Sequence, residues 1–351
     1  MEILSIINTA INIILGVAIL SAFGIVFGLL YRGIDRKLSF ALLKTPSPYI
    51  FQPFKDVSKL FKKKNIVPEN SIPWIFNFAP MAGLVAILAI LFYIPVGGFG
   101  PLLSTDGDII LVVYLLLISS ITLPIGGFSS GSRYAAIGSQ REIVKLISYI
   151  FPFLIVIIGI VWAIDLQGVD DAFAFSAILS NPVWNFVGAL GFIGFVIMLV
   201  VTITIVSAQL SKTPFDDVKS DSEIAGGALA EYSGRNLAIF YLTDSVKLIV
   251  LSSIVVALFF PYNLSSLLGI QGYFSSIIDF VFYLVKVFVI TFFTATLARM
   301  VTTRKRTDQV LYTYWTTLTL AALVGLICIM WDMWTMNQFG LQTLAEMINL
   351  I

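Results

Sequence analysis

Eight long apolar runs constrain the fold of this chain more than any other feature of its sequence. Each run is long enough to cross roughly 30 Å of hydrocarbon as a helix of about 20 residues. They lie near Ile6–Leu30, Ile72–Val96, Ile109–Phe128, Ile143–Ile164, Val183–Ser207, Leu237–Phe260, Ile277–Ala298 and Val310–Met333. The runs lack the strict alternation of barrel strands and are too long for them. We therefore expect an all-α polytopic membrane protein with about eight transmembrane helices, forming one transmembrane domain over residues 1–351.

Composition limits the chemistry that the chain can perform. Residues are 58% hydrophobic and only 12% charged, whereas about 25% are charged in a soluble domain. Histidine is absent and Cys328 is the sole cysteine, so no iron–sulfur or haem ligand set is available. We expect no metal, no cofactor and no catalytic redox centre in this chain. The net charge of +1 gives no indication of nucleic-acid binding.

The basic residues predict the orientation in the membrane. Nineteen of the 21 lie in loops one, three, five and seven or just beside them, and the other two, Lys247 and Lys286, lie inside spans. Because cytoplasmic loops are rich in lysine and arginine, this distribution places the odd-numbered loops in the cytoplasm and both termini outside the cell. The first run lacks a basic leader and a cleavage site, so we expect it to be a retained helix of a cell-membrane protein.

The longest cytoplasmic loop contains an amphipathic segment at about residues 50–64. Helical spacing puts apolar side chains on one face, namely Phe54, Val57, Leu60 and Phe61. Lysines occupy another face, namely Lys55, Lys59 and Lys62. This pattern predicts a helix lying on the anionic inner leaflet; a simple lipid-facing anchor would show the same pattern.

Four ionisable residues fall within the predicted spans. Asp244 and Lys247 share one face of the sixth span, and Asp279 and Lys286 share one face of the seventh. A lone charge in hydrocarbon costs about 2.5–3.5 kcal/mol, so these side chains should face the protein interior. A static ion pair or a snorkelling lysine would satisfy this requirement, and Asp279 lies near the outer end of its span. We favour a role in ion conduction for the set.

The fifth loop, at about residues 209–235, is acidic although the other cytoplasmic loops are basic. Its carboxylates are Asp216, Asp217, Asp221, Glu223 and Glu231. A solvated loop is one interpretation, and a carboxylate-lined funnel or a docking surface for a basic partner is another. The apolar stretch at 224–229 between these acids predicts a segment that dips back into the protein or packs under a docked subunit.

The order of these features resembles subunit 1 of respiratory complex I and its homologues in membrane-bound hydrogenases. The acidic loop reads PFD at 214–216, SE at 222–223 and EYSG at 231–234, similar to the family's block in that loop. FYLTD at 240–244 resembles its aromatic-plus-acid stretch. The pattern R…RxRxDQ…W from Arg299 to Trp315 and the segments DRK at 35–37 and QP at 52–53 also resemble family motifs.

The resemblance implies a non-redox membrane subunit of a proton- or sodium-pumping oxidoreductase. Its implied partners are hydrophilic hydrogenase-like and iron–sulfur subunits on the cytoplasmic face, antiporter-like membrane subunits, and the lipid bilayer. The implied charge path begins at Asp216, Asp221, Glu223 and Glu231 and continues through Asp244, Lys247 and Lys286. The residues that would dock partners are Arg36, Lys37, Arg141, Arg304, Arg306 and Asp308.

Departures from the family pattern favour its hydrogenase-like or sulfur-reducing branch. TPSPY at 45–49 stands where complex I has RxGPN, and SYI at 148–150 lacks the carboxylate of the family's SYE. Lys145 replaces a glutamine. Two alternatives stay open: the quinone-chamber subunit of complex I proper, and a stand-alone secondary transporter. A transporter would show two similar halves, which this sequence lacks.

Overall fold

The computed structural model is a bundle of long helices. It describes residues 2–103, 107–169, 171–216, 218, 224–269 and 273–339. The long helices are α1 (Glu2–Leu42), α3 (Pro73–Ile90), α4 (Asp108–Ser129), α5 (Arg133–Asp165), α7 (Ala189–Gln209), α9 (Gly234–Phe259), α11 (Tyr273–Thr291) and α14 (Thr319–Phe339). The shorter ones are α2 (Gln52–Lys62), α6 (Phe175–Ser180), α10 (Leu264–Leu268), α12 (Ala298–Val301) and α13 (Thr307–Tyr312), with 3-10 turns η1 (Val183–Asn185) and η2 (Gly227–Leu229).

Eight helical segments of the described chain are long and apolar enough to cross a membrane, which confirms the expected polytopic all-α fold. Two of them contain a π-helical segment, η3 (Phe292–Leu297) between α11 and α12 and η4 (Thr313–Leu318) between α13 and α14. The expected start of the fifth span at Val183 is wrong. Pro182 precedes a separate 3-10 turn at Val183–Asn185, and α7 begins only after Gly188, at Ala189.

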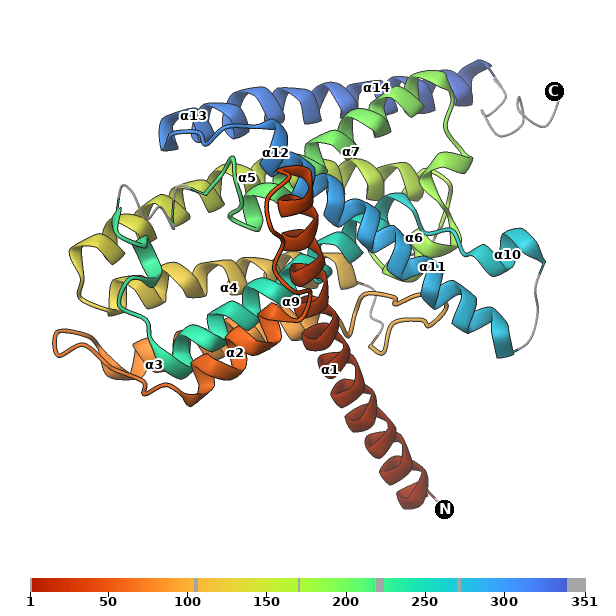
Figure 1. Cartoon of the computed structure of the whole chain (residues 1–351). Helices are drawn as coiled ribbons and strands as arrows, with labels where there is room; N and C mark the ends of the chain where they lie inside the picture. Colours follow the sequence, from red (N-terminus) through yellow and green to blue (C-terminus); the bar gives the residue numbers. More distant parts are fainter. Residues whose placement is uncertain are drawn as a thin grey trace.

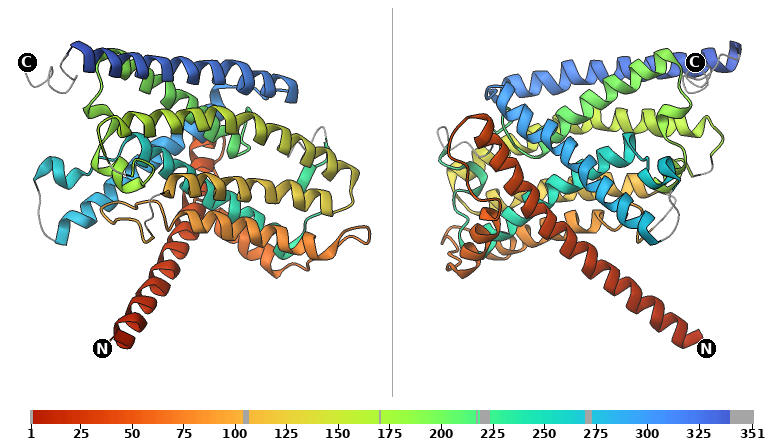
Figure 2. Two further views of the ribbon diagram at one scale, coloured as in Figure 1. Left: turned by 180° about the vertical axis from the view of Figure 1, so that it is seen from behind. Right: turned by 45° about the vertical axis from the view of Figure 1, so that its right-hand side comes forward.

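Helix α9 lies at the centre of the bundle. Its apolar side chains are buried almost throughout, because α1, α3, α7 and α11 all pack against it. Helix α1 crosses α9 closely at Gly28, where an added Cβ would come within 2.8 Å of the Ser245 carbonyl oxygen. The N-terminal half of α1 projects from the bundle (Figures 1 and 2), and side chains such as Ile14 and Ile19 are exposed there. In a membrane protein such a surface faces lipid or another membrane subunit.

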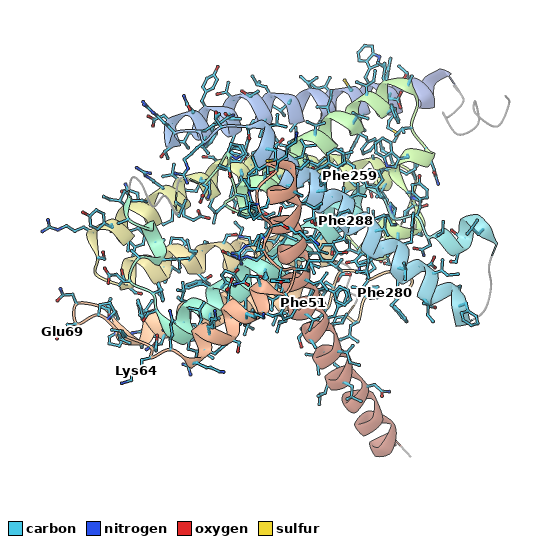
Figure 3. The ribbon with its side chains drawn as sticks, viewed as in Figure 1. Phe51, Lys64, Glu69, Phe259, Phe280 and Phe288 are labelled. Carbon is cyan, nitrogen blue, oxygen red and sulfur yellow. The ribbon has the colours of Figure 1, made fainter. Side chains whose placement is uncertain are left out.

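The first and last turns of the helices form two separate ends. At one end, the Ile72 amide donates to the Ser129 carbonyl oxygen, the Ile66 amide donates to Ser233, and the Lys305 amide donates to the Pro214 carbonyl oxygen. Figure 3 shows Lys64 and Glu69 at the edge of the molecule, in the connection from α2 to α3. We call this the basic end, because the connections there contain most of the lysines and arginines of the chain.

The connections after α3, α5 and α9 meet at the opposite end. There the Ile109 amide donates to the Phe173 carbonyl oxygen, and the Trp184 indole donates to the Phe259 carbonyl oxygen. Tyr262 donates to Asn185 across the same end. We call this the acidic end, since Asp165, the last residue of α5, and Asp171, in the connection after it, lie there. The chain therefore alternates between two ends of different charge.

Two segments at the basic end pack back onto the bundle. Helix α2 forms within the expected 50–64 segment, and Val57 packs against Leu29 of α1 and Leu242 of α9. The apolar stretch at 224–229 contains η2, in which Ala228 is fully buried and which packs against α4 and α5. An added Cβ on Gly138 of α5 would lie 2.5 Å from the Ala228 amide nitrogen. The expectation that this stretch dips into the protein is confirmed.

Candidate functional site

A buried carboxylate organises the centre of the basic end. Asp35 of α1 has 2% of its surface exposed, and its Oδ2 lies 2.6 Å from Lys212 Nζ and 3.4 Å from an Arg299 nitrogen. Thr296 donates to Asp35 Oδ1 at 2.8 Å. The π-helical segment η3 supplies Thr296 and leads into Arg299, so it directs both side chains toward α1. Short π-helical segments within α-helices occur frequently at functional sites.

Two arginines of α1 extend this cluster toward α9 and α2. Arg32 donates to the Tyr241 carbonyl oxygen at 2.9 Å and to Ser245 at 3.0 Å, and its guanidinium lies 3.5 Å from the centre of the Tyr241 ring. It also interacts electrostatically with Asp244. One turn later, Arg36 pairs with Asp56 of α2 at 3.2 Å.

These side chains enclose a cavity of about 180 Å³, which we call the charged cavity. Its wall consists of Arg32, Asp35, Arg36, Leu210, Ser211, Lys212, Asp244, Leu248 and Arg299. Burial lowers the pKa of the Lys212 ammonium to about 8; the Asp35 carboxylate opposes this shift and the Arg299 guanidinium adds to it. Lys212 therefore stays mostly protonated at neutral pH, but it loses its proton at a lower pH than an exposed lysine does.

A second, smaller cavity lies next to the charged cavity, deeper in the bundle. Its volume is about 20 Å³, enough for about one water molecule. The wall includes Glu142, Gln209, Lys247 and two residues that also line the charged cavity, Ser211 and Asp244. We call it the inner cavity. Asp244 and Ser211 therefore separate two polar spaces.

The inner cavity is bordered by buried charges from two helices, α5 and α9. Glu142 and Lys145 form an ion pair at 2.7 Å on α5, with side chains 4% and 0% exposed. Lys145 also donates to Ser211 at 2.9 Å. Lys247 of α9 donates to Ser120 of α4 at 2.9 Å. Sequence reasoning missed Glu142, although its spacing of three residues from Lys145 at the start of a long apolar run is the pattern of an ion pair on one helical face.

The predicted charge-path residues separate into groups. Asp244 and Lys247 both line the inner cavity, and Asp244 also lines the charged cavity. Asp216 pairs with Arg304 at 3.1 Å in a partly exposed position, and Glu231 is exposed. Asp217, Asp221 and Glu223 lie outside the described residues.

Lys286 is not part of this group. Its Nζ donates to the carbonyl oxygens of Phe260 and Tyr262, at 2.9 and 2.6 Å, beyond the last turn of α9 at the acidic end. Asp279 accepts hydrogen bonds from the Ser265 amide and hydroxyl there. The structure therefore does not bring Lys286 together with Asp244 and Lys247.

The residues predicted to dock partners are all at the basic end, in different settings. Lys37, Arg306 and Asp308 are exposed, and so is Arg304, which pairs with Asp216. Arg141 is half-buried, and Arg36 lines the charged cavity. Gln309, in the same motif, accepts a hydrogen bond from the Arg306 amide at the start of α13. Within the described ranges, no three histidine, cysteine or carboxylate side chains gather as a metal site.

Comparisons with known proteins give the family. The family described as NADH dehydrogenase matches residues 6–330. The chain belongs to this family. It is 27% identical over 329 residues to an NADH-quinone oxidoreductase subunit of Dehalococcoides mccartyi, an alignment that covers 90% of this chain and 86% of that protein. It is also 27% identical to hydrogenase-4 component C of Escherichia coli, over 84% of this chain and 89% of that protein.

A solved structure confirms the fold of this family member. The match is to a chain of the membrane-bound sulfane sulfur reductase, an archaeal respiratory membrane complex, with a TM-score of 0.78 over 91% of this chain and 99% of that one. Its sequence identity is 24%, so the likeness concerns the fold. The protein is a multi-pass membrane homologue of an NADH-quinone oxidoreductase subunit and of a hydrogenase component.

Proposed function

We propose that this family member is the non-redox membrane subunit of a proton- or sodium-pumping oxidoreductase, and that it begins a charge path through its two cavities. The observation that carries the proposal is the junction at Asp244 and Ser211, which line both the charged cavity and the inner cavity. A carboxylate between two polar spaces is placed to exchange a proton with water on either side.

The proposed path follows the contacts inward from the basic end. It starts at the acidic loop with Asp216, Asp221, Glu223 and Glu231, and reaches the cluster of Asp35, Lys212 and Arg299. From there Asp244 and Ser211 lead to the pair Glu142–Lys145 and to Lys247. Charge that arrives near one member shifts the protonation of the next, because interactions between charges are strong where water is scarce.

The basic end is the proposed docking face for hydrophilic subunits and lies in the cytoplasm, with both termini outside. The exposed residues Lys37, Arg304, Arg306 and Asp308 support this orientation, as does the basic character of the connections. Hydrophilic hydrogenase-like and iron–sulfur subunits would cover this end, and antiporter-like subunits would lie beside it in the membrane.

The charged residues in the wall of the charged cavity favour a charge path over the binding of a quinone within the chain. Sites for organic ligands are mostly apolar and usually measure about 300–1,000 Å³, whereas this cavity has about 180 Å³ and six charged residues in its wall. The NADH-quinone oxidoreductase relatives keep the quinone function as the second candidate. Tight binding of a quinone-site inhibitor to the assembled complex would support that alternative.

Asp244→Asn in the intact complex, reconstituted in liposomes, tests the path. We expect at least a tenfold loss of ion translocation per electron transferred, with normal assembly, and recovery in Asp244→Glu, which restores the carboxylate. Asp308→Asn is the matched control, because Asp308 is an exposed carboxylate at the same end. Unchanged translocation in Asp244→Asn would contradict the path. Glu231→Gln and Glu223→Gln test its start by the same measurement.

Extraction from the native membrane in mild detergent tests the partners. Mass spectrometry should find iron–sulfur proteins and antiporter-like subunits together with this chain. A chain that emerges alone or as a homo-oligomer would contradict the subunit role and would favour a stand-alone transporter.

A further inference from the structure

The charged cavity has more cationic than anionic side chains in its wall. Arg32, Arg36, Lys212 and Arg299 face two carboxylates, Asp35 and Asp244. Asp56, which pairs with Arg36, stands outside this wall and adds a third carboxylate. An excess of one positive charge therefore remains even when Asp56 is included. Like charges gathered in a partly buried space repel one another, and an anion between them removes that repulsion.

Three of the cationic side chains lie on different sides of the charged cavity and are held there by two carboxylates, Asp35 and Asp56. Asp35 holds Lys212 and Arg299 on one side, at 2.6 and 3.4 Å. Arg36 is held by Asp56 on the α2 side, at 3.2 Å. These pairs fix three cations in the wall of one cavity and leave the volume of about 180 Å³ between them. This volume is large enough for several water molecules.

The charged cavity opens toward the surface of the protein beside α2. The side chains of Arg36 and Arg299 are 32% and 31% exposed, whereas the Asp35 side chain behind them is 1% exposed. Helix α2, whose Val57 is packed on α1 and α9, borders this opening. Because α2 is amphipathic and lies beside the ends of membrane-spanning helices, the opening lies at the level of the lipid headgroups.

We propose that the charged cavity binds a phosphate-type oxyanion between Arg36, Arg299 and Lys212. Guanidinium groups match phosphate oxygens with paired N–H donors, and a lysine adds a compact positive charge. Basic pockets between membrane helices at the cytoplasmic level bind anionic headgroups by this chemistry. The phosphate belongs either to an anionic phospholipid or to a free anion. Binding of either ligand does not require the proposed pumping role, so the two proposals can be tested independently.

Binding to the purified, delipidated chain in detergent tests the proposal. The probes are phosphatidylglycerol and phosphatidylcholine, counted by native mass spectrometry, and inorganic phosphate, measured by the shift in thermal unfolding midpoint. The test variant is Arg36→Gln with Arg299→Gln, which removes two of the three proposed contacts. The control is Lys37→Gln, which removes a neighbouring exposed cation that is not part of the cavity wall.

We expect one phosphatidylglycerol to bind the wild type and Lys37→Gln at least tenfold more tightly than the double variant, with no such preference for phosphatidylcholine. A phosphate-induced shift that the double variant loses, without lipid binding, would identify a free anion as the ligand and would also support the site. Arg299→Lys alone retains the charge and should keep most of the binding, so it separates lost binding from lost folding. If the folded double variant bound phosphatidylglycerol and inorganic phosphate as tightly as the wild type does, the proposal would be overturned.

Discussion

The two ends of the bundle use buried charges in opposite ways. At the basic end, Asp35 binds Lys212 and Arg299, and the charges surround a cavity. At the acidic end, the charges bind the backbone: Lys286 donates to two carbonyl oxygens beyond α9, and Asp332 accepts from the Gly188 amide at the start of α7, at 2.7 Å. Helix ends leave backbone groups without partners inside the helix, so charges at the acidic end stabilise helix ends.

This difference distinguishes two roles that a charged side chain can have inside a membrane protein. A charge whose hydrogen bonds go to the backbone joins the ends of neighbouring helices. A charge that interacts with other ionisable groups across a water-sized space responds to their protonation. The position of a residue in an apolar run does not distinguish the two cases, because both kinds of charge occur within or beside such runs.

The largest expected effect is on the basic end. Asp35→Ala leaves Lys212 and Arg299 without their carboxylate, and loss of one member of a buried charge pair costs about 3–5 kcal/mol. We expect a large fall in the thermal unfolding midpoint in detergent. The control is Asp56→Ala, which removes a carboxylate that is 29% exposed and should cost much less. Equal stability of Asp35→Ala and the wild type would show that the cluster does not hold the basic end together.

A smaller effect is expected at the acidic end. Lys286→Met loses two hydrogen bonds from a charged donor, and such bonds contribute about 1.5–3 kcal/mol each where they are fully buried. Lys286 is only half-buried, so water replaces part of this contribution and the loss should be smaller than for the buried Asp35. The folded yield and the unfolding midpoint should fall, while ion translocation per electron in the complex that does assemble stays normal. Lys286→Arg keeps the charge and should retain more stability. Normal stability with lost translocation would instead place Lys286 in the charge path, as its position in the sequence suggested.

The pH dependence of stability sharpens the comparison further. The folded pKa of Lys212 is about 8 and lies below its ordinary value of 10.5. Between these two values the unfolded chain binds more protons than the folded one, so Lys212 makes stability rise with pH, by about 1 kcal/mol per pH unit at most. Unfolding midpoints of wild type and Lys212→Gln from pH 7.5 to 9.5 measure this. An identical pH slope in both proteins would contradict the shift.

The smallest effect is expected at the surface of the basic end. Arg304 and Asp216 form a pair whose side chains are 36% and 28% exposed, and such pairs contribute about 0–1 kcal/mol. Arg304→Gln should therefore leave the unfolding midpoint nearly unchanged, as should the control Arg306→Gln. A change as large as that of Asp35→Ala would mean that the surface pair, and not the buried cluster, fixes the acidic loop.

Much of the fold and part of the site could be predicted from local patterns. The apolar runs predicted eight spans, and the apolar stretch at 224–229 predicted a segment that packs into the bundle. Asp244 and Lys247 were found because an ionisable pair in an apolar run is expensive unless it faces other polar groups. Glu142 was missed because it lies at the margin of its run, where a charge is ordinary in a sequence.

The sequence by itself determined the membrane fold, the family motifs and the distribution of charge between alternate connections. These features depend on local composition, since hydrocarbon requires long apolar helices wherever they sit in the bundle. Only the tertiary structure decided which charges meet. Asp35, Lys212 and Arg299 come from segments far apart in the chain, and η3 directs Thr296 and Arg299 toward α1. The rotation and crossing of helices set these contacts, and a pattern along one helix does not contain that information.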